Sequence, residues 1–251
     1  MFKRYIVTLM AFLPIHLLAN NFSVQLDSAN SYYQSAQYEQ AIEIYESIIA
    51  DDYESAEIYY NLGNAYYKSN KFPMAIVNYE RALKLNPSDE DITFNLQLAN
   101  THVVDKIDVL PEFFLKSWSD SLVKAMSSNQ WAIVSIVLFV VGLALILMFF
   151  LSSSVQLRKI VFWCGALCIV VSLFAFKFSG QQKQTIINEP EVIVITPSVV
   201  VRSAPNNDAT ELFLIHEGLK VKVTNNRDGW SEIKLSDGNK GWVKTTDFVK
   251  I

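Results

Sequence analysis

Two segments of the chain repeat each other at a spacing of 34 residues, and this spacing constrains the fold more than any other feature. The positions that recur are Tyr32, Ala41 and Tyr45 in the first segment and Tyr66, Ala75 and Tyr79 in the second. Apolar residues in both segments follow a period of about 3.6, which is typical of amphipathic helices. One short helix pair cannot bury its apolar face alone, so stacked pairs form a solenoid with a concave surface. The spacing therefore predicts a chain that binds other proteins.

Breaks in the helical pattern divide the N-terminal part into five helices. They fall near Gln37, near Asn70, at residues 51–52 and at residues 86–87. The pattern predicts an all-α domain over residues 22–104, with one helix pair over 22–55, a second over 56–89 and a capping helix over 89–104. Asp89 is expected to cap the last helix, because its carboxylate can accept hydrogen bonds from the first backbone amides.

Two apolar runs follow the repeats, in a chain that is 51% hydrophobic and 18% charged. Residues 131–151 carry no charge, and in residues 160–178 the only charged residue is Lys177. Runs of about this length cross a bilayer as helices, and a lysine near one end can reach the interface. Residues 152–159 are too short for a domain. We expect two transmembrane helices, joined by a cytoplasmic loop over 152–159.

Small residues in both runs favour close contact between these helices, notably Gly142 and Gly165. The chain's two cysteines, Cys164 and Cys168, share one face of the second helix. A redox pair is one interpretation. Plain packing is the favoured one, because a thiol surrounded by lipid is a poor thiolate.

The first 19 residues have the pattern of a secretory signal peptide. Lys3 and Arg4 precede an apolar stretch, and Ala19 permits cleavage after it. An uncleaved anchor is the alternative. Export of the repeats followed by two spans places both soluble domains outside the membrane. Arg158 in the connecting loop agrees with a cytoplasmic position for that loop.

Residues 105–130 form an amphipathic linker, and Pro111 is expected to open a helix there. This helix either lies in the membrane interface or packs on the fifth helix, and both alternatives remain open.

The segment 191–251 consists of short β-rich runs separated by turns rich in Gly, Asn, Asp and Pro. The runs are residues 192–195, 199–202, 219–224, 230–235 and 241–244. This pattern predicts a small all-β barrel. The expected fold is thus a multidomain membrane protein with an α-solenoid, a two-helix hairpin and a β-barrel.

Composition and motifs argue against several function classes. The net charge of -4 gives no basic surface for nucleic acid. The three histidines have no partners at metal-ligand spacing, so no metal or cofactor is expected. Phosphate-binding loops, nucleophile elbows and zinc-protease motifs do not occur. We therefore expect a protein that is not an enzyme.

Residues 56–89 resemble a complete tetratricopeptide repeat. The positions that carry the resemblance, and that are expected to form the repeat core, are Tyr59, Leu62, Gly63, Tyr66, Ala75, Tyr79, Ala82 and Pro87. The segment 22–55 matches more loosely.

The resemblance also indicates which residues face the concave groove. They are Asn30, Asn61, Asn64 and Asn95. Some tetratricopeptide domains hold a partner's terminal carboxylate with a basic clamp. The basic positions of that clamp hold Leu26, Asp91 and Asn95 here, so the resemblance implies a groove for an extended or helical segment instead.

The C-terminal segment resembles a bacterial SH3-like domain. The resemblance lies in residues 201–205, 216–218, 228–230 and 241–243. Trp230 and Trp242 are candidate ligand platforms, although both also occur as regular packing residues of this fold.

The order of these parts resembles the BatE-like proteins of the Bacteroides aerotolerance (Bat) operon. The stretches 110–114 and 128–131 are also similar to that family. The resemblance implies an inner-membrane scaffold, linked to aerotolerance or stress, with periplasmic N- and C-terminal domains. Its implied partners are von Willebrand A-domain Bat proteins and a MoxR-type ATPase.

We therefore expect an adaptor in which the two soluble modules are tethered on the exported side. One alternative is a cell-wall sensor whose SH3-like domain binds peptidoglycan. Another is an assembly factor that holds unfolded clients.

Overall fold

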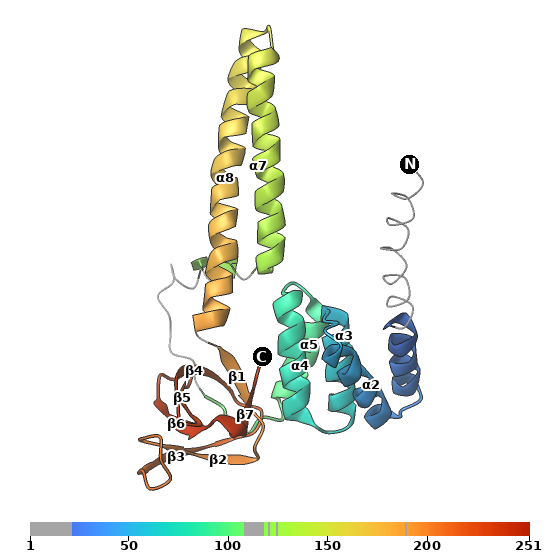
Figure 1. Cartoon of the computed structure of the whole chain (residues 1–251), viewed down its shortest axis with the longest axis vertical. Coiled ribbons are helices and arrows are strands. Elements are labelled where there is room, and N and C mark those ends of the chain that lie inside the picture. Colours follow the sequence, from blue (N-terminus) through green and yellow to red (C-terminus); the bar gives the residue numbers. More distant parts are fainter. Residues whose placement is uncertain (1–21, 108–117, 120, 124, 189) are drawn as a thin grey trace, which may run out of the picture.

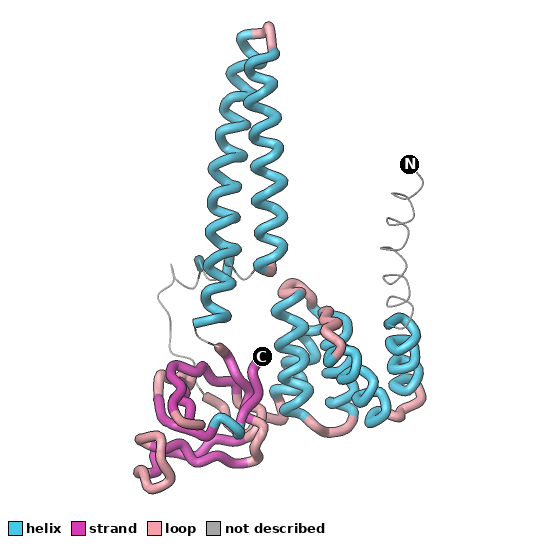
Figure 2. The backbone as a smooth tube through the Cα atoms, viewed as in Figure 1, coloured by secondary structure: helices cyan, strands magenta, loops and turns pink. Residues whose placement is uncertain are grey.

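The structure is a computed structural model that describes residues 22–107, 118–119, 121–123, 125–188 and 190–251. The expected signal peptide and the expected helix start at Pro111 lie outside the described residues. Three parts are visible in Figures 1 and 2: an array of short helices, a long antiparallel helix pair, and a β domain beside the helical array.

The helical array contains the repeats. Its helices are residues 22–34, α2 (Tyr38–Ala50), α3 (Ala56–Lys68), α4 (Phe72–Leu85) and α5 (Glu90–Asn100). The Ser55 hydroxyl caps α3 by accepting from the Ile58 amide at 3.1 Å. The Asp89 carboxylate caps α5 by accepting from the backbone amides of Asp91 and Ile92. This confirms the cap expected from the sequence.

The repeat positions pack the helices against one another. Tyr59, Leu62, Gly63, Tyr66, Ala75, Tyr79 and Ala82 are buried, whereas Pro87 is half-buried. A Cβ atom added to Gly63 would lie only 2.7 Å from the ring of Tyr79. This close approach explains why a residue without a side chain is needed at the contact between α3 and α4.

The long helix pair consists of α7 (Ser128–Leu151) and α8 (Val155–Asn188). Ser127 and Gln130 form a capping box at the start of α7. Both helices are long and apolar enough to cross a membrane, with mean hydropathy of 3.1 and 2.2 in their apolar stretches. The helices exceed the apolar runs 131–151 and 160–178, and the connection is residues 152–154 rather than 152–159. Polar residues at these ends continue the helix because helical hydrogen bonding does not require apolar side chains.

Polar and small residues of α7 contact α8 at regular intervals along the two helices. Ser135 and Ser172 each donate to the other's backbone oxygen, at 3.0 and 2.8 Å. Further along, Gly142 faces Gly165, and a Cβ on either would lie 3.1 Å from the other's backbone oxygen.

The same register holds at both ends of the pair. The facing residues, in order along α7, are Ser128 with Ser179, Ser135 with Ser172, Gly142 with Gly165, and Phe149 with Arg158. Successive steps of seven residues are typical of two helices that coil around each other.

The β domain is a single antiparallel sheet. Its strands are β1 (Glu191–Val194), β2 (Ser198–Arg202), β3 (Glu211–His216), β4 (Lys220–Arg227), β5 (Trp230–Lys234), β6 (Lys240–Lys244) and β7 (Phe248–Lys250). Their order is β3-β2-β6-β5-β4-β1-β7. β3 and β7 were not among the strands predicted from the sequence.

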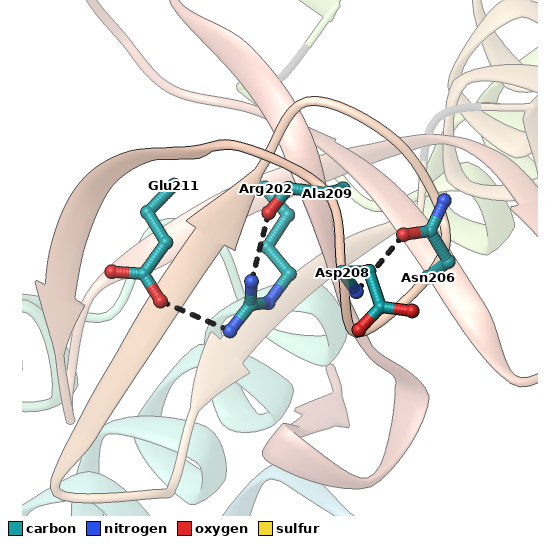
Figure 3. A network of polar contacts seen from close by, with 5 residues as sticks. All are labelled: Arg202, Asn206, Asp208, Ala209 and Glu211. Atoms are coloured by element: carbon teal, nitrogen blue, oxygen red, sulfur yellow. Dashed lines mark hydrogen bonds and ion pairs between the residues drawn. The ribbon is translucent and has the colours of Figure 1, made fainter.

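The loop between β2 and β3 is closed by side chains (Figure 3). Arg202 donates to the backbone oxygen of Ala209 at 2.9 Å and pairs with Glu211 at 3.1 Å. The Asn206 side chain accepts from the Asp208 amide at 3.1 Å. These contacts fix the turn that returns the chain to the edge of the sheet.

The end of the β domain lies on the outer face of α4, and we call this contact the α4 seam. Arg81 donates to the backbone oxygen of Lys250 at 2.9 Å, and Lys84 donates to that of Ile251 at 2.6 Å. Ile193 is buried in the same apolar cluster as the repeat core, and Ile251 packs against it. The two modules are therefore docked together rather than only tethered.

Charged contacts surround this apolar centre. Lys220 pairs with Glu80 of α4 and with Glu191 of β1, both at 2.8 Å. Burial acts to lower the pKa of Lys220, but the two carboxylates together raise it above its ordinary value. Asp105 accepts from the backbone amide of His216 at 2.5 Å and contacts the His216 ring nitrogen Nδ1 at 2.9 Å.

Candidate partner-binding groove

The asparagines of the expected groove lie in two equivalent hydrogen-bonded sets. In the first set, the Asn30 side-chain oxygen accepts from the Tyr45 hydroxyl at 2.5 Å. The same oxygen accepts from the Asn61 amide at 3.4 Å. A tyrosine on the second helix of the repeat therefore orients an asparagine on the first helix, which in turn orients an asparagine of the next repeat.

The second set repeats this pattern 34 residues further on. The Asn64 side-chain oxygen accepts from the Tyr79 hydroxyl at 2.7 Å and from the Asn95 amide at 3.0 Å. The Asn95 amide also donates to the Tyr60 hydroxyl at 3.0 Å. We call each set a Tyr–Asn relay.

Each relay leaves one side-chain amide nitrogen and one side-chain amide oxygen without a partner among the described residues. Among the described residues, the Asn30 and Asn64 side-chain amides and the Asn61 and Asn95 side-chain oxygens have no hydrogen-bond partner. A backbone amide unit of a bound chain offers one acceptor and one donor. The relays therefore present oriented groups that match an extended polypeptide.

The second relay lines a pocket of about 270 Å³. Its walls are Tyr33, Tyr60, Asn64, Tyr67, Lys68, Tyr79, Asn95 and Leu98. Of these eight wall residues, the sequence indicated only Asn64 and Asn95 as groove residues. The others could have been found by helical spacing, because Tyr60, Asn64 and Tyr67 recur every three or four residues on one face of α3.

The relay tyrosines remain protonated donors at neutral pH. Burial raises the pKa of Tyr45 to about 12. Burial likewise raises the pKa of the relay tyrosine Tyr79 above the ordinary value, as it does for Tyr33 in the pocket wall. Ionisation of either relay hydroxyl would remove the donor that orients the asparagine.

The structure also places the positions that correspond to the basic clamp. Leu26 is half-buried, Asp91 is exposed, and Asn95 belongs to the second relay. Across the described parts of the chain, no group of three His, Cys, Asp or Glu side chains could hold a metal ion. The pocket of the second relay thus combines asparagine side chains, tyrosine walls and one lysine, Lys68.

Comparison with known families agrees with this architecture. Residues 56–89 match the family described as tetratricopeptide repeat, residues 29–70 match one described as TPR repeat, and residues 197–250 match the bacterial SH3 domain. The chain contains tetratricopeptide repeats and a bacterial SH3 domain. We call its helical array the tetratricopeptide domain and its β domain the SH3 domain.

Two crystal structures are among the solved structures that resemble this chain, both at low sequence identity. A crystal structure of MamA protein shares 20% identity, covers 69% of this chain and 79% of its own, and has a TM-score of 0.32. A second crystal structure of MamA also shares 20% identity, covers 67% of this chain and 82% of its own, and has the same TM-score. Scores this low support no inference about function. The comparison with curated proteins gives no match.

The SH3 domain has a pocket of its own, of about 370 Å³. Trp230 forms one wall, and Phe248 and Lys250 of the docked strand β7 form another. The Lys244 ammonium lies 6.0 Å from the centre of the Trp230 ring. Trp242 is half-buried on β6 and lies opposite Glu232 in the pairing of β6 with β5. It is not part of this pocket. The structure therefore separates the two tryptophans that the sequence grouped as ligand candidates.

Proposed function

We propose that the protein is a membrane-anchored adaptor whose tetratricopeptide groove binds an extended segment of a partner protein. Tetratricopeptide repeats and an SH3 domain support a role in protein interaction. The observation that carries the proposal is the repeated Tyr–Asn relay, because each relay leaves one amide nitrogen and one amide oxygen free to bind a peptide backbone. No catalytic step is proposed for any residue.

The anchor in this proposal is the pair of helices α7 and α8, crossing the inner membrane. The signal peptide over 1–19 exports the tetratricopeptide domain, and α8 returns the chain to the same side, so that both domains are periplasmic. The length and hydropathy of both helices support this arrangement. Reporter fusions after Asp105, after Ser154 and after Ile251 test it. The expected result is periplasmic, cytoplasmic and periplasmic activity, and a cytoplasmic reporter after Ile251 would refute the shared side.

The partners in this proposal are those of a Bat-type envelope complex linked to aerotolerance or stress. The support is the sequence resemblance in the order of the domains. Affinity purification of the full chain from solubilised membranes should recover von Willebrand A-domain proteins and a MoxR-type ATPase. The double variant Asn61→Ala, Asn95→Ala should lose them while it keeps the wild-type circular dichroism spectrum. Equal recovery with both proteins would contradict the role of the groove.

A second candidate function is binding of peptidoglycan by the SH3 domain. The pocket beside Trp230 is the observation that favours it. The full chain in detergent should then sediment with purified cell wall, and Trp230→Ala should abolish this sedimentation. Trp242→Ala is the matched control, because Trp242 is not part of that pocket. A chain that stays in the supernatant under these conditions excludes this candidate.

A further inference from the structure

The pocket around the second Tyr–Asn relay is built by the first helices of both repeats, by α4 and by the capping helix α5. Tyr33 comes from the helix over residues 22–34, Tyr60 and Tyr67 come from α3, and Leu98 comes from α5. Its volume of about 270 Å³ is below the range of roughly 300–1,000 Å³ that is usual for small-molecule sites. The size suits one large side chain of a bound segment.

Tyrosines make up half of the residues that line this pocket. The rings of Tyr60 and Tyr79 are tilted, with centroids 6.1 Å apart, and Leu98 adds an aliphatic surface. Aromatic rings in such arrangements pack well against a further aromatic or aliphatic group. The side chain that enters is therefore expected to be large and apolar.

Lys68 gives this pocket a positive edge. It is exposed in the last turn of α3, and none of the described residues forms an ion pair with it. Lys71 nearby is different, because it already pairs with Glu39 at 2.6 Å. Acidic residues lie at the opposite ends of the same first helices, with Glu57 in the first turn of α3 and Asp91 in that of α5. A bound carboxylate is thus attracted to the Lys68 edge and repelled from the other one.

We propose that this pocket binds a large apolar side chain that lies next to an acidic residue in an extended partner segment. The apolar side chain packs between the tyrosines, and the neighbouring carboxylate pairs with Lys68. The free amide of Asn64 donates to a backbone oxygen of the segment, and the free oxygen of Asn95 accepts from a backbone amide. This inference rests on the proposed groove function and specifies the chemistry of the segment.

Selection from a phage library of random peptide segments, against the full chain in detergent, tests this proposal. The expected result is enrichment of segments that carry Phe, Tyr, Trp or Leu beside Asp or Glu. The same selection against Lys68→Glu should enrich Lys or Arg at that neighbouring position. Lys234→Glu, an exposed charge reversal on the SH3 domain, is the matched control and should select the wild-type pattern.

Titration of one enriched synthetic peptide against each variant measures how much its binding affinity changes. Lys68→Glu should weaken its binding about 3- to 10-fold, which is the range for an exposed ion pair that becomes repulsive. Asn64→Ala and Asn95→Ala should weaken it about 10- to 100-fold, because the backbone groups of the peptide lose their partners. Thermal unfolding of each variant shows that the domain remains folded at the titration temperature.

The results of the selection and the titration distinguish a failure of the proposed ligand chemistry from a failure of the proposed groove function. Segments that depend on Asn64 and Asn95 but bind equally to Lys68→Glu would overturn the proposed ligand chemistry and leave the groove function standing. A selection that enriches nothing, or only segments insensitive to Asn64→Ala and Asn95→Ala, would contradict both.

Discussion

At the scale of single residues, two of the four groove asparagines, Asn30 and Asn64, are each oriented by a tyrosine on the second helix of the same repeat. The hydroxyls of Tyr45 and Tyr79 supply this orientation at 2.5 and 2.7 Å. The resemblance to tetratricopeptide repeats indicated these asparagines as groove residues, and the structure shows that they are hydrogen-bonded to one another. The relays themselves could not be predicted, since they depend on side-chain geometry across three helices. Groove chemistry is therefore set partly by residues that the sequence identifies only as core.

Removal of one relay hydroxyl should affect binding more than folding. Tyr79→Phe keeps the buried ring but loses the donor to Asn64, which should cost about 0.5–1.5 kcal/mol of folding free energy. Binding of a groove peptide should fall as well, because the Asn64 side chain becomes free to turn. Urea unfolding and peptide titration measure the two effects. Tyr66→Phe is the control, because its hydroxyl contacts Glu46 outside the relays. Unchanged peptide affinity in Tyr79→Phe would show that the relay does not orient Asn64.

The buried tyrosines also predict a loss of stability in alkali. Burial, with a hydrogen bond to Glu54, raises the pKa of Tyr59 from 10.0 to about 12. The folded state then holds this proton more tightly than the unfolded state, so the stabilisation is complete below pH 10 and is lost as the pH rises towards 12. Urea unfolding followed by circular dichroism should show falling stability over this window. Tyr59→Phe should make the fall shallower, and an identical slope would refute the assignment.

At the scale of elements, α7 and α8 form a pair with a fixed register. Facing residues follow each other in steps of seven, through two serine pairs and one glycine pair. Serine hydroxyls between membrane helices contribute only about 0.6 kcal/mol each on average, so their main effect is to select one register. The sequence predicted close contact at Gly142 and Gly165. It could not identify the serine pairs, because their pairing depends on where the turn between the helices lies.

A cysteine pair tests this register. In a background with Cys164 and Cys168 changed to serine, Ser135→Cys with Ser172→Cys should form a disulfide on mild oxidation. The two serine oxygens lie 3.2 Å apart, and a disulfide requires Cα atoms within about 7 Å. Ser135→Cys with Leu173→Cys is the control, because Leu173 is 61% exposed and faces away from α7. Equal cross-linking of both pairs on a non-reducing gel would contradict the register.

Two strands show where sequence patterns fall short for the β domain. β7 has only three residues, which is too short for a periodic pattern, and it becomes a strand through its pairing with β1. β3 carries exposed leucines, Leu212 and Leu214, in place of the polar residues that an alternating strand would show. Both strands lie at the edges of the sheet, where the burial pattern is weakest.

At the scale of the whole molecule, the α4 seam makes one body of the tetratricopeptide and SH3 domains. The sequence predicted both domains but not their contact, because the contact joins residues that are far apart in the chain. Lys220→Glu places a third carboxylate beside Glu80 and Glu191, and it should destabilise the seam by about 1–3 kcal/mol. The seam should then open while each domain stays folded.

Spin labels on Glu43 and Asn239, both exposed, report this opening as a broader distance distribution. Glu80→Lys combined with Lys220→Glu should restore the narrow distribution. Lys234→Glu should leave it unchanged. A narrow distribution in Lys220→Glu would show that the charged contacts do not hold the seam.

The length of the continuous helix α8 determines where the SH3 domain begins relative to the helix pair. This helix ends at Asn188, and β1, which packs beside α4, begins at Glu191. Each residue of an α-helix turns the chain by about 100° and advances it by about 1.5 Å. One residue added to α8 beyond the paired serines would rotate the start of the SH3 domain by about 100° about the helix axis, whereas seven added residues would return it to nearly the same direction, about 10 Å further along. The length of α8 therefore sets both the direction in which the SH3 domain leaves this helix and its distance from the paired serines; an insertion of seven residues preserves the direction, and an insertion of one residue does not.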